Sequence, residues 1–129
     1  MAKTVDDTVL DAALNTIKNG AIRMAVCSSQ PTTYSQIAGF RLAEATISSA
    51  SFTGPAAGNT PSAGLGRRLS TVLQSGVSIT GTGTQTANFV VLHNNSSVMY
   101  YVTTCTAQSL ANGGTVNIPV WSIEIAGPV

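Results

Sequence analysis

From residue 21 onward, apolar residues recur at every second position, and turn-forming residues interrupt the chain at short intervals. Ile22, Met24 and Val26 alternate with their neighbours, a pattern typical of a half-buried strand with opposite faces. The tetrapeptides GTGT, NNSS and ANGG supply turns between later strands. Because no helical segments alternate with these strands, the pattern favours an antiparallel sandwich or barrel over a parallel sheet.

One helix is predicted, over residues 6–19. Its apolar residues recur three and four positions apart, at Val9, Leu10, Ala13, Leu14 and Ile17. Asp6 or Asp7 is suited to cap the first turn, and Gly20 is expected to end the helix in a left-handed conformation. A chain of 129 residues has room for one hydrophobic core. We therefore expect a single domain over 1–129, with β structure over 21–129.

Shorter features refine this expectation. Residues 33–37 predict a turn or short helix, and RLAEATIS predicts a second strand. Residues 48–66, rich in Gly, Ala, Pro and Ser, predict a long flexible loop, either a mobile surface loop or an arm that orders against a neighbouring subunit. Gly76 indicates a bulge or kink. The last strand changes phase, and a bulge near Pro119–Val120 would return its apolar residues to the core.

Formal charge is scarce and unevenly distributed. Charged residues make up 9% of the chain, against about 25% in an average soluble domain. From Leu69 to Val129 the one charged side chain is Glu124. A free monomer normally keeps a mixed charged surface, whereas interface cores are depleted in charge. The pattern favours a surface that rests on another protein; the alternative is that Ser, Thr and Asn keep this half soluble unaided.

Several partner classes lack their sequence signals. The net charge is +1, and Arg67–Arg68 is a lone basic pair, so we expect no nucleic-acid binding. No apolar run approaches the ~18 residues of a membrane helix, and the N-terminus does not resemble a signal peptide. We therefore expect synthesis in the cytosol, no membrane partner and free thiols. A Cys27–Cys105 disulfide would require neighbouring strands and an oxidising environment.

Candidates for chemistry are few. His93, the single histidine, precedes the NNSS turn, and we interpret it as a polar residue flanking that turn and not as a general base. No G-x-S-x-G motif, metal-ligand spacing or complete phosphate loop occurs. Tyr100 and Tyr101 are adjacent in a strand, so one is expected in the core and one on the surface. We predict no enzyme activity, no metal and no cofactor.

Two stretches resemble a known family. The opening DDTVLDAALNTIKNGAIRMAVCSSQPTTYSQ is similar to the start of a family of small tailed-phage virion proteins, and VMYYVTTCTAQSLANGGTVNIPVWSIEIAGP is similar to their closing strands. Such proteins look like capsid decoration, or cement, proteins. The resemblance implies a β-sandwich or jelly-roll fold and a dimer or trimer bound outside an icosahedral shell.

The leading hypothesis is a virion protein that binds the major capsid protein and bridges adjacent subunits. The rivals are a tail, head–tail connector or host-binding protein, distinguished by copy number per particle, and a small carbohydrate-binding or hydrolytic β module. Candidate interface residues, chosen from composition, lie in the N-terminal segment, the long loop, the basic pair and the tyrosine pair: Lys3, Asp6, Phe52, Leu65, Arg67, Arg68, Tyr100 and Tyr101.

Overall fold

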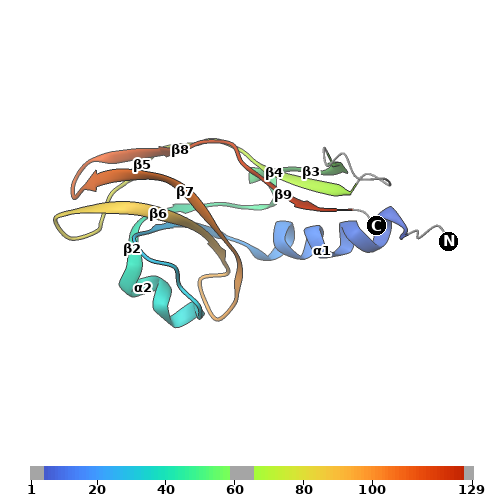
Figure 1. The fold of residues 1–129 in the computed structure, drawn as a ribbon, viewed down its shortest axis with the longest axis horizontal. Coiled ribbons are helices and arrows are strands. Elements are labelled where there is room, and N and C mark those ends of the chain that lie inside the picture. Colours follow the sequence, from blue (N-terminus) through green and yellow to red (C-terminus); the bar gives the residue numbers. More distant parts are fainter. Residues whose placement is uncertain (1–4, 59–65, 127–129) are drawn as a thin grey trace.

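The computed structural model describes residues 5–58 and 66–126 and is mainly antiparallel β, with 51% strand and 21% helix. The molecule is elongated, with a wide end and a narrow end (Figure 1). The wide end, here called the body, comprises β1 (Arg23–Cys27), β2 (Arg41–Thr46), β5 (Gln74–Ser78), β6 (Thr84–His93), β7 (Met99–Ala111) and β8 (Thr115–Ile118), with the short helices η1 (Tyr34–Gln36) and α2 (Ile37–Phe40). The narrow end, the arm, comprises α1 (Asp7–Gly20), η2 (Ser49–Ser51), β3 (Phe52–Ala57), β4 (Arg67–Thr71) and β9 (Ser122–Ile125).

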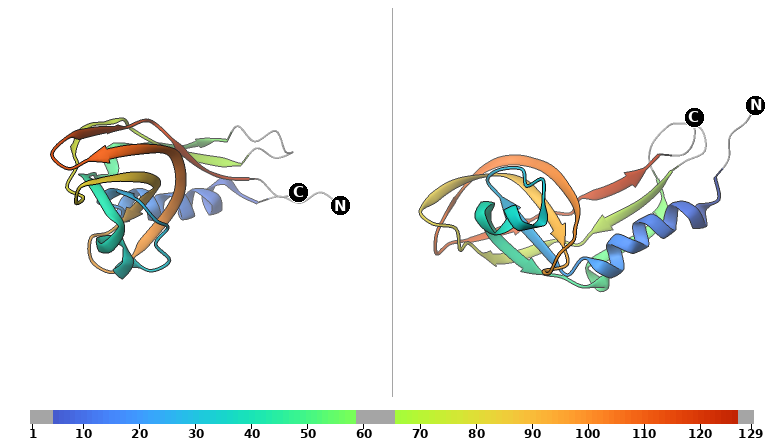
Figure 2. Two further views of the ribbon diagram at one scale, coloured as in Figure 1. Left: turned by 60° about the vertical axis from the view of Figure 1, so that its left-hand side comes forward. Right: turned by 90° about the horizontal axis from the view of Figure 1, so that it is seen from below.

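The strands of the body form a curled run. One sheet has the order β2-β1-β6-β7, and a second pairs β5 with β8. A bridge between Ala43 and Ile79 joins β2 to β5, so the run reads β7-β6-β1-β2-β5-β8. Figure 2 shows it curving around a common interior. The run does not close, because no ladder joins β7 to β8 in the part of the chain described.

Strand β1 lies at the centre of this run and is buried on both faces. Its inner face carries Met24 and Val26, which join the main hydrophobic core. Its outer face carries Ala25 and Cys27, which pack with Ile37 of α2 in a second cluster. The expected half-buried strand is therefore wrong, because η1 and α2 cover the face that would otherwise meet solvent. The short helix expected over 33–37 and the strand expected at RLAEATIS are confirmed.

The predicted N-terminal helix is confirmed as α1, and Asp6 is its cap, with an oxygen accepting from the Thr8 amide at 2.8 Å. The helix lies along the three-stranded sheet β3-β4-β9 (Figure 2). Within residues 7–20 Leu14 alone is buried, and Val9 is 61% exposed. The apolar face of the helix therefore packs against the sheet over only part of the helix length.

The expected left-handed Gly20 is wrong. Gly20 does not have a positive φ, and the chain leaves the helix through extended Ala21. A β-carbon at position 20 would overlap the ring of Tyr100. The glycine therefore leaves room for the Tyr100 ring at the helix end and does not serve a left-handed backbone conformation.

The long loop predicted over 48–66 contains regular structure in its described part, which corrects the expectation of a flexible loop there. Residues 52–57 form β3, which pairs with β4, so their backbone groups have ladder partners that composition could not indicate. Phe52 is buried in the main core. Leu65 lies outside the described residues.

The phase change in the last strand marks a change of sheet. Strand β8 pairs with β5 in the body, whereas β9 pairs with β4 in the arm. Between them Trp121 is fixed to Thr71 by paired hydrogen bonds of 2.8 and 3.1 Å. The predicted one-residue bulge at Pro119–Val120 is thus a full break in the strand. The bulge predicted at Gly76 is confirmed by its φ of 66° and a register shift between β5 and β8.

Candidate functional site

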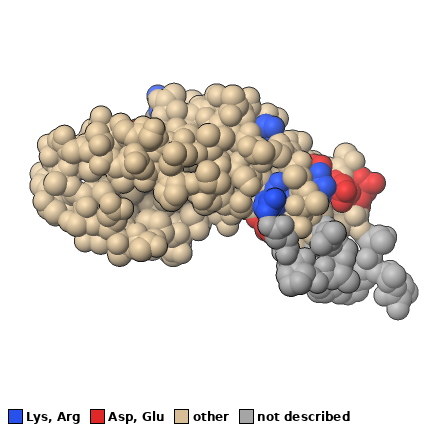
Figure 3. Space-filling view, turned by 90° about the horizontal axis from the view of Figure 1, so that it is seen from above, with Lys and Arg blue, Asp and Glu red and all other residues tan. Residues whose placement is uncertain are grey.

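Charged side chains are concentrated in the arm. Among the described residues, the body carries three, Arg23, Arg41 and Glu44, and these form one network. The others lie on α1 and its cap, β4 and β9. Seen from above, the body presents a broad surface nearly free of Lys, Arg, Asp and Glu (Figure 3). Residues 69–123, which include β5, β6, β7 and β8 of the body, contain no Lys, Arg, Asp or Glu.

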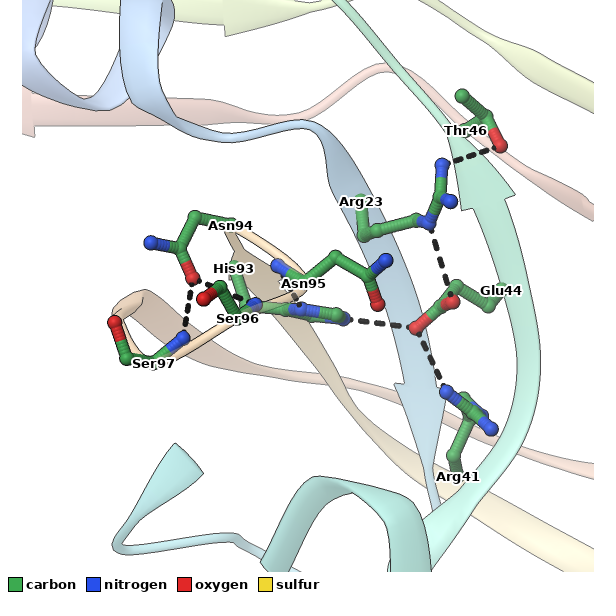
Figure 4. A network of polar contacts seen from close by, with 9 residues as sticks. All are labelled: Arg23, Arg41, Glu44, Thr46, His93, Asn94, Asn95, Ser96 and Ser97. Atoms are coloured by element: carbon green, nitrogen blue, oxygen red, sulfur yellow. Dashed lines mark hydrogen bonds and ion pairs between the residues drawn. The ribbon is translucent and has the colours of Figure 1, made fainter. Parts of the chain in front are cut away.

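The charged network of the body is centred on Glu44 of β2 (Figure 4). One carboxylate oxygen lies 3.5 Å from Arg23 Nε, and the other lies 3.2 Å from Arg41 Nη1 and 2.8 Å from His93 Nε2. Arg23 also donates to Thr46 Oγ1 at 2.7 Å. Arg23, Glu44 and His93 meet because β1 lies between β2 and β6, which places their side chains on one face.

The hydrogen bonds of His93 define its tautomer. Nδ1 accepts from the Asn95 backbone N–H at 3.0 Å, so the ring proton lies on Nε2 and is donated to Glu44. The imidazole is 1% exposed, and Tyr34 packs edge-on against it at a centroid distance of 5.6 Å. His93 therefore flanks the turn as expected, but it is also buried, which its place in the sequence did not indicate, and it joins the turn to the sheet.

The turn after His93 is held by the side chain of Asn94. Its amide oxygen accepts from the backbone N–H groups of Ser96, Ser97 and Val98 at 2.8–3.0 Å. Asn95 has a φ of 58°, a left-handed conformation that asparagine tolerates. Glu44 and His93 have the chemical character of an acid–base pair, but both ring nitrogens of His93 are hydrogen-bonded, one to Glu44 and one to the Asn95 backbone N–H. The pair therefore organises the turn.

The predicted interface residues do not form one patch. Arg67 pairs within the chain, with Nε 2.7 Å from Asp11 and Nη1 3.6 Å from Asp7, and its hydrogen bond to Asp11 raises its pKa. Arg68 stands opposite Glu124 on β9. The hydrogen bonds from Thr8 lower the pKa of Asp6, the helix cap. Lys3, like Leu65, lies outside the described residues.

The tyrosine pair lies on β7, a strand of the body without charged residues. Both Tyr100 and Tyr101 are partly buried and pack on the main core, so the expectation of one core and one surface residue is wrong. Tyr101 stacks on Trp121 at 5.9 Å between ring centroids, with 21° between the planes. The indole Nε1 of Trp121 is buried without a hydrogen-bond partner among the described residues.

Exposed aliphatic residues flank this aromatic pair in the chain. Val72 and Leu73 follow Thr71, which is bonded to Trp121, and are 41% and 51% exposed. Val120 precedes Trp121 and is 60% exposed. The sequence does not reveal these residues, because an exposed Val or Leu has no local signal. Their exposure depends on where the sheets of the body and the arm separate.

The uncharged surface also contains an opening between β7 and β8, here called the seam. One end of the seam is the turn at 112–113, and the other is the Tyr101–Trp121 stack. Between them lies a half-enclosed cavity of about 150 Å³. It is lined mainly by residues of β6, β7 and β8, namely Ala87, Val90, Cys105, Thr106, Gln108, Leu110, Val116, Asn117, Ile118 and Pro119, with Val26 of β1.

The two cysteines are free thiols in separate hydrophobic clusters. Strand β6 lies between β1, which carries Cys27, and β7, which carries Cys105, so the neighbouring strands that a disulfide requires are absent from this arrangement. Burial raises the pKa of Cys27 to about 12, and burial also raises the pKa of Cys105. Cys105 contacts the cavity, whereas Cys27 is fully buried.

Metal-ligating side chains do not gather in groups of three or more within residues 5–58 and 66–126. Over the same residues, no helix combines the length and apolar character needed to cross a bilayer. Comparisons with protein-family models, curated proteins and solved structures gave no match.

Proposed function

We propose that this chain is a phage capsid decoration protein, which binds the outer surface of a shell made of the major capsid protein and stabilises it by bridging neighbouring subunits. One observation carries the proposal: the body presents a broad surface without charge. The three charged side chains of the body satisfy one another around Glu44 among the described residues. Interface cores are depleted in charge in the same way.

Exposed aliphatic and aromatic residues support a protein partner. Val72, Leu73 and Val120 are exposed beside the Tyr101–Trp121 stack. Aromatic side chains surrounded by apolar contacts are the usual anchors of protein interfaces. A surface of this composition gains little from binding a charged ligand, and it loses little charge solvation when covered by another protein.

The mechanism that we propose is multivalency. Many copies each contact two or three subunits of the shell, so modest individual contacts combine into strong retention. The resemblance noted above leads us to propose also a jelly-roll-like sandwich as the family fold, a dimer or trimer as the assembled form, and the virion, assembled in the host cytoplasm, as the location.

Sedimentation with empty shells tests the proposal. Purified protein is mixed with undecorated shells, unexpanded and expanded, assembled from the major capsid protein of the same phage. We expect the protein to pellet with one of the two shell forms, in proportion to capsid subunits and not at a dozen or fewer copies per particle. Failure to pellet with either form would refute the assignment, and the lower copy number would indicate a connector or tail protein.

A pair of substitutions locates the contact surface. Leu73→Glu places a charge on the proposed surface, and we expect it to weaken shell binding at least tenfold, since a desolvated unpaired charge is costly. Val9→Glu is the matched control, because Val9 is a similarly exposed aliphatic residue on the arm helix. Equal effects of the two substitutions would show that the uncharged surface is not the contact.

A further inference from the structure

The seam has the features of a binding site for an extended peptide segment. Strand β7 runs for 13 residues and pairs with β6 on one side; among the described residues no strand pairs with its other side. Proteins usually protect such an edge with lysine, proline or a short strand. Residues 99–111 contain no charged residue and no proline, so the edge of β7 remains open to pairing.

The cavity lies directly beside this open edge. Cys105, Thr106 and Gln108 of β7 line one side, and Val116 and Ile118 of β8 line the other. Its volume of about 150 Å³ is close to that of aliphatic cavities that take up a benzene molecule. The cavity is therefore large enough for one leucine or phenylalanine side chain, and its lining contains no formal charge.

We propose that the seam binds an extended, uncharged segment of a protein partner, which pairs with the edge of β7 and inserts one apolar side chain into the cavity. In this mode of recognition the main-chain hydrogen bonds supply affinity, and the pocket for a side chain supplies specificity. The inference deepens the proposed function and rests on it for the expectation that the partner is a protein.

Each property of the occupant follows from a property of the seam. The open ladder edge requires an extended backbone. The uncharged lining excludes acidic and basic side chains at the inserted position, because a charge there would lose its hydration without gaining a partner.

A synthetic peptide tests the proposal without the shell. The probe has nine residues and blocked ends, with threonine at even positions, serine at both ends, valine at the third and seventh positions and leucine at the centre. Fluorescence anisotropy of the labelled peptide measures its binding. We expect saturable binding that weakens at least tenfold when aspartate replaces the central leucine, and again when proline replaces the flanking threonines.

Cys105 allows the cavity to be blocked reversibly. Benzyl methanethiosulfonate at pH 9 forms a mixed disulfide with the Cys105 thiolate and releases methanesulfinate, which places a benzyl group at the cavity. We expect peptide affinity to fall at least tenfold and to return after reduction with dithiothreitol. Cys27→Ala is the control: its thiol lies in the other cluster, so this variant should respond to the reagent as the parent chain does.

The outcomes separate the inference from the proposed function. A peptide that fails to bind, or binds equally well with aspartate at its centre or after benzylation, overturns the assignment of the seam, even if the protein pellets with shells. A dimer of this chain that dissociates on benzylation also overturns it, in favour of a second copy as the occupant. Peptide binding without shell binding would retain the seam and reject the decoration role.

Discussion

At the scale of single residues, Glu44 organises the charged part of the body. Its carboxylate contacts Arg23, Arg41 and His93, and His93 in turn holds the turn at Asn95. The sequence shows a histidine before a turn, but the partner is 49 positions away. Its identity depends on the pairing of β2 and β6 with β1, which no local pattern specifies.

Removal of the Glu44 carboxylate should destabilise the fold. Glu44→Ala leaves the buried Nε2–H of His93 without its acceptor, so we expect the free energy of unfolding to fall by about 1–3 kcal/mol. Urea unfolding monitored by Trp121 fluorescence measures the change. In the control Asp7→Asn, the side chain is 66% exposed, and the loss should stay below about 1 kcal/mol. A Glu44→Ala chain as stable as the parent would contradict a structural role for the network.

Cys27 should make stability fall at high pH. Burial raises its pKa from an ordinary 9.0 to about 12. Above pH 9 the unfolded chain releases this proton while the folded chain retains it, so ionisation favours unfolding. Between pH 9 and 11 we expect a loss of about 1 kcal/mol per pH unit from this thiol. In Cys27→Ala the free energy of unfolding should therefore fall less steeply with pH, by that amount per pH unit. Identical pH dependence in the two proteins would refute the assignment of the effect to Cys27.

At the scale of elements, residues 6–20 and the strands nearest to them follow from local patterns. Asp6 caps α1 as the sequence predicts, and the period-two pattern locates β1. The division of the predicted last strand into β8 and β9 does not follow from local patterns. Pro119 and the phase change indicate an irregularity, but the transfer of β9 to the arm depends on its pairing with β4, which is separated from it by some fifty residues of sequence.

The helix of the arm should depend on the two ion pairs of Arg67 for its attachment to the sheet. Arg67 of β4 contacts Asp11 and Asp7 of α1, while Leu14 is the buried apolar contact. We expect Arg67→Gln to accelerate hydrogen exchange of the α1 amides and to leave that of β1 and β6 unchanged, because local opening precedes global unfolding. Arg68→Gln, at the next position on the same strand, is the control and should leave α1 protected. Equal protection of the α1 amides in the parent chain and both variants would show that the ion pairs of Arg67 do not hold the helix.

At the scale of the whole molecule, composition indicates a charge-poor β protein but not its division into a charged arm and an uncharged body. That division arises because the pairing of β3, β4 and β9 places Arg67, Arg68 and Glu124 in the arm, where Arg67 contacts the acidic residues of α1. The seam is equally inaccessible to local analysis, since β7 and β8 are consecutive strands that a hairpin pattern would pair. Both features depend on contacts distant in sequence.

If the uncharged surface carries the binding, retention of the protein on shells should depend little on salt. Exposed charge pairs are screened within about 10 Å at 0.1 M salt and within about 3 Å at 1 M. Retention on undecorated shells is measured by sedimentation at a series of NaCl concentrations across this range. We expect the affinity for the shells to stay constant within about twofold or to increase with salt. A tenfold or greater loss would show that charged residues carry the binding and would contradict this expectation.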